Sequence, residues 1–152
     1  MTNGSDMRSW GITVLRVVVG VVFLMHGGQK FFMGFHNVAG FLASLRIPAP
    51  QAAAIALTLL EFFGGMALVL GLFTRVVALL LAFDMAVAVV LVHLKNGFFS
   101  PAGFEFPLTL LAATLCLAFS GSGVASVDRM IGRKAVRGET RSTESVFTSS
   151  PR

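Results

Sequence analysis

Residues 52–94 read AAAIALTLLEFFGGMALVLGL (52–72), FTR (73–75) and VVALLLAFDMAVAVVLVHL (76–94), and this stretch decides the fold. Each apolar run is long enough to cross a hydrocarbon layer about 30 Å thick as an α-helix. Only three residues separate the runs, and so short a connection joins antiparallel neighbours. The stretch therefore predicts a hairpin of two membrane-crossing helices.

Two further apolar runs flank this hairpin. The first, residues 10–33, is interrupted by Arg16 and by the polar stretch HGGQK at 26–30. The last, residues 104–121, is followed by a Ser-Gly stop signal. We therefore predict an all-α fold, an integral membrane four-helix bundle with helices near 10–33, 52–72, 76–94 and 104–121.

The composition agrees with this class of protein. Of the 152 residues, 55% are hydrophobic and 12% charged, with a mean hydropathy of +0.83. The four runs leave no length for a Rossmann or P-loop domain, so any chemistry is expected inside the bilayer or on a partner protein. The single cysteine, Cys116, excludes an intrachain disulfide and a cysteine-built metal site, and we predict no metal.

Basic residues are distributed unequally between the two sides of the predicted bundle. Nine of the 12 fall on the side of the termini, against Lys30, Arg46 and Lys95 on the other side. By the positive-inside rule, both termini are predicted to be cytoplasmic. Residues 1–9 would then be a cytoplasmic N-terminus, 10–121 the membrane domain and 122–152 a basic, mostly disordered tail. Because the basic residues lie at segment ends, the net charge of +5 does not indicate nucleic-acid binding.

The first outer loop is expected to contain a short amphipathic helix. Residues 35–48 read FHNVAGFLASLRIP, and proline stops the pattern at 48 and 50. The apolar residues at helical spacing are Val38, Phe41, Leu42 and Leu45. We predict that this helix lies on the outer membrane surface.

Arg16, Glu61 and Asp84 fall deep inside the apolar runs, where charged residues are costly unless paired or hydrated. At about 1.5 Å per residue, Arg16, Asp84 and Glu61 lie about 9, 13 and 16 Å from the cytoplasmic ends of their helices, a spread that long side chains can bridge. We expect a buried cluster in which two carboxylates share one arginine and one proton remains exchangeable. The alternative is an ion pair that only fixes helix packing.

Helical phase sorts the remaining polar residues. At about 100° per residue, inward faces are predicted on the first helix for Arg16, Gly20, Gly27 and Lys30, and on the last for Glu105, Thr109, Ala112 and Cys116. His26, Lys30, His93, Lys95 and Glu105 fall at similar depth near the outer end. By the same count His93 lies opposite Asp84, so an interfacial position is predicted for His93. Lys30 and Lys95 could instead extend to the outer headgroups.

Several short stretches, taken together, resemble the DoxX family. They are Arg16 with HGGQK at 26–30, FLASLRIP at 41–48, Glu61 before Gly64-Gly65, GLFTR at 71–75 and GFE at 103–105. The resemblance covers residues 15–129 in order. It implies a multi-pass, four-helix protein of the bacterial cytoplasmic (inner) membrane.

The resemblance also implies a setting and a set of site residues. DoxX relatives include the small membrane subunit associated with thiosulfate:quinone oxidoreductase and proteins linked to membrane redox complexes and oxidative-stress defence. The polar positions that match the family pattern are Arg16, His26, Lys30, Glu61, Arg75 and Glu105. Asp84 joins the candidate ligand-binding or buried polar cluster from its depth alone.

The leading functional hypothesis is a quinone-linked subunit or membrane anchor of a redox or oxidative-stress complex. A quinol head group would lie among the inward polar groups, with Glu61, Glu105 or His26 as proton acceptors. The sequence has no flavin, haem or iron–sulfur signature, so no intrinsic cofactor is expected and a bound quinone or a redox partner would carry electrons.

Three alternatives belong to other classes of function. The first is a small-molecule or lipid transporter or binder acting as a homo-oligomer, since four helices are few for alternating access in one chain. The second, a b-type cytochrome with His26 and His93 as axial ligands, is disfavoured by the phase of His93. The third is a passive assembly protein in the lipid bilayer whose ion pairs only hold its helices together.

Overall fold

The computed structural model describes residues 4–99 and 101–130, and these residues form helices and turns without any strand. Three helical spans, 6–33, 50–70 and 74–96, are long and apolar enough to cross a membrane, and a shorter apolar helix follows at 105–120. The predicted all-α membrane class is therefore confirmed. The helices are α1 (Gly4–Met33), α2 (Phe35–Ser44), α3 (Pro50–Leu70), α4 (Thr74–Val87) and α5 (Glu105–Ser120).

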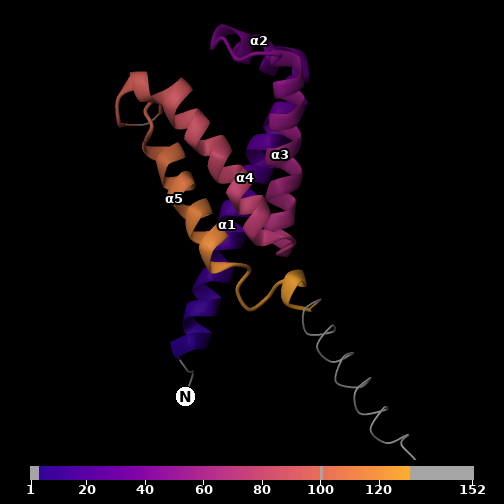
Figure 1. Cartoon of the computed structure of the whole chain (residues 1–152), viewed down its shortest axis with the longest axis vertical. Helices are drawn as coiled ribbons and strands as arrows, with labels where there is room; N and C mark the ends of the chain where they lie inside the picture. Colours follow the sequence, from indigo (N-terminus) through magenta and orange to yellow (C-terminus); the bar gives the residue numbers. More distant parts are fainter. Residues whose placement is uncertain (1–3, 100, 131–152) are drawn as a thin grey trace, which may run out of the picture.

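The helices form two pairs that diverge. α1 packs along α3 and α4 packs along α5, and the pairs meet near the ends that carry the chain termini (Figure 1). Toward the end that carries α2 the pairs spread apart (Figure 1). We call these two ends of the molecule the termini end and the α2 end.

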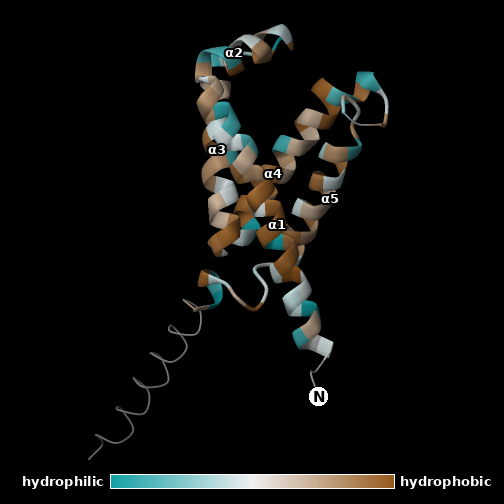
Figure 2. Cartoon of the chain, turned by 180° about the vertical axis from the view of Figure 1, so that it is seen from behind, coloured by the Kyte–Doolittle hydropathy of each residue, from teal (hydrophilic) through white to brown (hydrophobic). Residues whose placement is uncertain are grey.

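The outer surface of the helices is apolar. Hydrophobic residues colour most of the length of each long helix, and hydrophilic ones gather toward the turns (Figure 2). Large side chains on this surface include Phe32, which is 95% exposed, and Phe83 and Phe119. Apolar side chains of this kind favour contact with hydrocarbon rather than water. A helix can lie in hydrocarbon because its backbone hydrogen bonds are made within the segment.

Glycine allows α1 and α3 to touch backbone to backbone. A Cβ atom at Gly27 would lie 2.4 Å from the backbone N of Phe62, and one at Gly65 would lie 2.4 Å from the backbone N of Leu24. Small residues at the contact are the usual means by which membrane helices approach closely. Gly20, Gly27 and Arg16 are buried, as the predicted inward face of the first helix requires.

The inward face predicted for the last helix is wrong. Thr109, Ala112 and Cys116 are exposed, whereas the buried face of α5 carries Pro107, Leu110, Thr114 and Leu117. Thr114 lies in this apolar face because its hydroxyl donates to the carbonyl of Leu110 at 2.8 Å. In a membrane the outer side of a helix need not be polar, so polarity alone does not identify the buried face.

α2 is half-buried against α3. Val38, Ala39 and Leu42 pack with Ala54 of α3 in a small separate core. The helix ends at Ser44, four residues before the predicted limit, and Arg46 adopts a positive φ of 60° in the turn that follows.

At the termini end, residues 122–130 fold back onto the helices. The backbone N–H of Val124 donates to the hydroxyl of Thr13 at 3.0 Å, and the N–H of Asp128 donates to the carbonyl of Gly71 at 3.0 Å. The tail predicted at 122–152 thus begins with a packed segment. Its predicted disorder after about residue 133 lies outside the described residues.

Asp128 caps α4 from a distance in sequence. Its carboxylate accepts hydrogen bonds from the backbone N–H groups of Phe73 at 2.8 Å and Thr74 at 3.0 Å. Asp128→Ala leaves these N–H groups without their acceptor, so we expect a loss of about 1–2 kcal/mol of unfolding free energy. Thermal unfolding in detergent micelles measures the loss, with the exposed Asp6→Ala as the control. Equal melting temperatures for the two variants would contradict the capping role.

Candidate functional site

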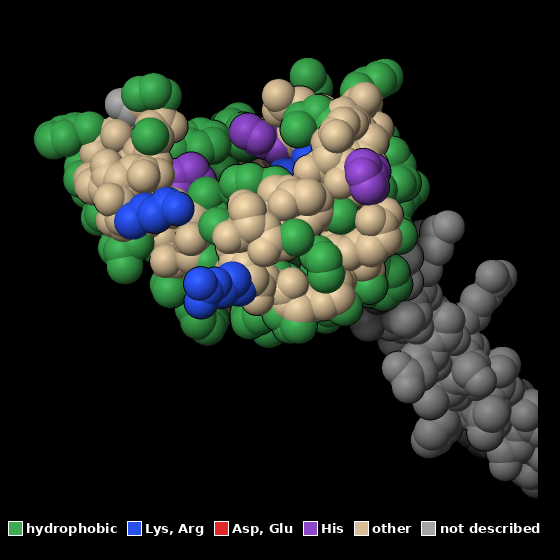
Figure 3. All heavy atoms as spheres, turned by 90° about the horizontal axis from the view of Figure 1, so that it is seen from above, with side chains coloured by type: hydrophobic (Ala, Val, Ile, Leu, Met, Phe, Trp, Pro, Cys, Tyr) green, Lys and Arg blue, Asp and Glu red, His purple; other side chains and the backbone are tan. Residues whose placement is uncertain are grey.

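A cavity of about 700 Å³ lies between the two helix pairs toward the α2 end. Its walls come from all five helices and are mainly apolar, with Leu57, Met85 and Leu110 among the lining residues. Seen from above, the molecule is hollowed, and Lys or Arg and His side chains appear among the hydrophobic ones (Figure 3). This size and composition are typical of sites for small organic ligands.

An ion pair forms the polar part of the cavity wall. The Nζ atom of Lys30, in α1, donates to Oε2 of Glu61, in α3. The Glu61 side chain is only 4% exposed and that of Lys30 is 25% exposed. The close glycine contact at Gly27, one turn before Lys30, brings the two helices near enough for this pair. Lys30 therefore does not extend to the headgroups but turns inward.

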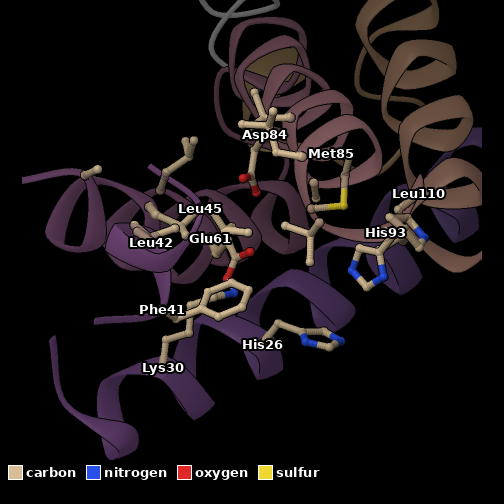
Figure 4. Close-up of a pocket in the computed structure, with 18 of the residues that line it drawn as sticks. His26, Lys30, Phe41, Leu42, Leu45, Glu61, Asp84, Met85, His93 and Leu110 are labelled. Carbon is tan, nitrogen blue, oxygen red and sulfur yellow. The ribbon is translucent and has the colours of Figure 1, made fainter. Parts of the chain in front are cut away.

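Asp84 adds a second acid to this pair. It lies on α4, and its charge interacts with those of Glu61 and Lys30. Figure 4 shows the carboxylates of Asp84 and Glu61 directed toward each other, with Lys30 beyond Glu61. The Oδ2 atom of Asp84 is buried and has no hydrogen-bond partner among the described residues. Two acids therefore lie beside a single ammonium group, which is paired with Glu61, and such an arrangement can hold and exchange a proton.

The two histidines near the α2 end of the long helices, His26 and His93, line the same cavity. His26 comes from α1, where its ring lies 5.9 Å from that of Phe106, and His93 comes from the end of the third membrane span. Figure 4 shows both imidazoles beside the space that also contains the acid pair. The count of helical phase from Asp84 did not predict this place of His93 in the cavity wall.

A change of helix type explains the position of His93. After Val87 the chain forms a π-helix over Ala88–His93 and then a 3-10 turn over Leu94–Asn96. A π-helix closes its hydrogen bonds one residue later than an α-helix, so each residue turns through a smaller angle. The count of about 100° per residue from Asp84 consequently fails here, and His93 turns toward the cavity.

Arg16 does not meet the two acids. Its guanidinium points to the termini end, where Nη1 donates to the carbonyl of Leu68 at 2.8 Å and Nη2 to that of Ala125 at 2.6 Å. The three residues were expected to cluster because their depths are similar, but the arginine extends along the helix in the opposite direction. Lys30 takes the place that the sequence assigned to Arg16.

The remaining predicted site residues lie apart from the acid pair. Arg75 is exposed in the first turn of α4, beside Gly121 at the end of α5. Glu105 begins α5 and is half-buried, but it does not line the cavity. Lys95 is exposed in the 3-10 turn. The structure therefore brings together Lys30, Glu61, Asp84 and the two histidines.

The α2 region contributes a wall of the cavity that the sequence did not assign to the site. Phe41, Leu42, Leu45 and Ile47 all line it. The helical spacing of Phe41, Leu42 and Leu45 predicts a helix on the outer membrane surface, but it does not predict their place in the cavity wall. Among the described residues no three His, Cys, Asp or Glu side chains are grouped as a metal ion would require.

Comparison with known proteins identifies relatives along most of the chain. A family model described as DoxX matches residues 11–94. "Putative oxidoreductase CatD" of Bacillus subtilis (strain 168) is 34% identical over 121 residues, which cover 80% of this chain and 87% of the relative. "Uncharacterized membrane protein Rv3486" of Mycobacterium tuberculosis is 33% identical, covering 88% and 94%. "Inner membrane protein YphA" of Escherichia coli (strain K12) is 32% identical, covering 78% and 88%. No solved structure matches the chain.

Proposed function

This chain belongs to the DoxX family of multi-pass membrane proteins, and from that premise we propose that it is a quinone-binding subunit or membrane anchor of a redox complex. The observation that carries the proposal is the cavity of about 700 Å³ with mainly apolar walls and one polar region, formed by Lys30, Glu61 and Asp84. A relative named as an oxidoreductase supports the same class of function.

The proposed topology places this cavity within the bilayer. We propose that α5 crosses the membrane as the fourth helix, which completes a four-helix bundle with both termini in the cytoplasm. The excess of basic residues on the side of the termini supports this orientation. The cavity then lies toward the outer half of the membrane, with its apolar walls open to a ligand dissolved in lipid.

Side chains in the cavity wall can accept the protons that a quinol releases. The ring would lie between the helix pairs, with one oxygen at the Lys30 ammonium and the acid pair. Oxidation of a quinol to a quinone releases two protons and two electrons. Glu61 and Asp84 lie beside one cation, so together they can take up a proton, and His26 can accept one at the other wall. Electrons pass to a partner protein, because the sequence has no signature for its own electron carrier.

Glu61→Gln tests the polar region of the site. We expect wild-type protein in lipid nanodiscs to bind decylubiquinone or decylubiquinol, and Glu61→Gln to bind about tenfold more weakly because Lys30 loses its charged partner and reorients. Equilibrium binding and the ligand-induced rise in melting temperature measure the effect. Asp6→Asn, in an exposed position on α1, is the matched control and should bind as the wild type does.

Native mass spectrometry of gently extracted protein separates the proposal from its main alternative. A retained quinone or redox protein supports a quinone-linked subunit. A homo-oligomer that retains phospholipid, with no binding of either quinone form, would instead favour a transporter or binder of lipids or small molecules. A folded protein that binds none of these compounds would contradict both functions.

A further inference from the structure

His93 reaches the cavity with its two ring nitrogens in different roles. Nδ1 lies 2.9 Å from the carbonyl oxygen of Ala102. A carbonyl oxygen only accepts hydrogen bonds, so Nδ1 must carry the hydrogen. In a neutral imidazole the other nitrogen, Nε2, then has a lone pair and no hydrogen. Neutral His93 can therefore offer a ligand an acceptor but no donor.

The surrounding backbone fixes this arrangement. The π-helix over Ala88–His93 turns the ring toward the cavity, and the carbonyl of Ala102 holds it there. Asn96 donates to the same carbonyl at 3.1 Å, so the turn after the π-helix is tied to the loop before α5. π-helical segments within α-helices frequently occur at functional sites.

The other polar wall does not discriminate in this way. Lys30 has three N–H donors and gives one to Glu61, while the carboxylates of Glu61 and Asp84 are acceptors. This wall can therefore bind either a carbonyl or a hydroxyl oxygen. The two oxidation states of a quinone differ in this respect, because the carbonyl oxygens of the quinone only accept and the hydroxyls of the hydroquinone also donate.

We infer that His93 is a specificity-determining residue whose Nε2 accepts a hydrogen bond from a ring hydroxyl, so that the cavity binds the hydroquinone more tightly than the quinone. The inference rests on the proposed function, because it concerns the oxidation state of the same ligand in the same cavity. With the quinone, a carbonyl oxygen would face the lone pair of Nε2 and no hydrogen bond would form.

The ratio of two affinities tests this assignment. Decylubiquinol and decylubiquinone have the same tail and ring substituents, and their binding to protein in nanodiscs is measured under anaerobic conditions. We expect the wild type to bind the quinol about threefold to tenfold more tightly, the range of one net hydrogen bond. His93→Leu should abolish the difference by weakening quinol binding alone. In His93→Gln the amide can donate or accept, so the two affinities should again become similar.

The control is His36→Leu, since His36 is an exposed histidine on α2 that does not line the cavity. It should keep the wild-type ratio. Unchanged quinone affinity in His93→Leu shows that the cavity remains folded. Equal binding of both forms by the wild type, or a preserved preference in His93→Leu, would overturn the role of His93 and leave the proposed function standing. Binding of neither form would overturn the proposed function and this inference with it.

Discussion

Replacing Arg16 with alanine is expected to lower the free energy of unfolding by about 3–5 kcal/mol, because it removes two hydrogen bonds from a buried charged donor, each of which contributes about 1.5–3 kcal/mol. The side chain is 2% exposed and joins three segments: α1, the last turn of α3 through Leu68, and the packed C-terminal segment through Ala125. Alanine would leave two carbonyl groups without their donor and an empty space beside Gly71. Thermal unfolding in detergent micelles measures the loss.

The position of the positive charge also contributes to this loss. The carbonyl of Leu68 belongs to the C-terminal turn of α3, where the helix dipole is negative and a cation is favourable. Gly71 leaves space for the guanidinium, since a Cβ there would lie 2.0 Å from Nη1 of Arg16. Arg16→Lys keeps the charge but cannot reach both carbonyls, so it should recover only part of the stability. Arg8→Ala, at an exposed position of the same helix, is the control. A melting temperature for Arg16→Ala equal to that of Arg8→Ala would refute the structural role.

Gly27→Ala should also destabilise the protein, by about 1–3 kcal/mol, and should weaken quinone binding at the same time. The added methyl group would meet the backbone of Phe62 at 2.4 Å and the carbonyl carbon of Glu61 at 2.9 Å. Backbone cannot rotate away as a side chain can, so α1 must move away from α3. Lys30 lies one turn further along α1, and its ion pair with Glu61 would be stretched.

The neighbouring glycine provides a matched control for this prediction. A Cβ at Gly28 would lie 3.8 Å from the ring of Phe62, which is ordinary van der Waals contact. Gly28→Ala should therefore leave binding unchanged and hold or slightly raise stability, because alanine favours helix over glycine. Unfolding curves and decylubiquinol binding are compared for the two variants. Equal behaviour of Gly27→Ala and Gly28→Ala would show that the close approach of α1 and α3 is not needed.

The amino-acid sequence determined the class of fold and the residues that could form a polar site. The helices follow from local properties of the sequence. These are the apolar runs of membrane-crossing length, the connection of three residues after the second run, and the glycine residues on one face of the first helix. Glu61 and Asp84 were recognisable because a charge inside an apolar run is costly and needs a partner. The same reasoning could not say which partner each acid has.

Tertiary structure alone decided which charges meet. Arg16 and Lys30 lie on one face of α1. The depth count placed Arg16 closer to Glu61 and Lys30 near the outer end, but a long side chain can extend in either direction along its helix. The segment after α5 packs over Arg16, and the carbonyl of Ala125 in that segment binds the guanidinium at the termini end. The two carbonyl groups that accept its hydrogen bonds belong to Leu68 and Ala125, which are far from Arg16 in the sequence. No local sequence pattern therefore predicts these contacts.

Helix type and lipid exposure account for the other differences. The π-helix at Ala88–His93 changed the direction of His93, and a periodicity count assumes a constant turn per residue. The buried face of α5 was misassigned because lipid, unlike water, does not require polar residues outside, so the amphipathic pattern that orients a helix in a soluble protein is lost. The sequence alone thus determined the helices and the charged residues inside their apolar runs. Side-chain packing between the helices decided how each helix is rotated, and with it the cavity.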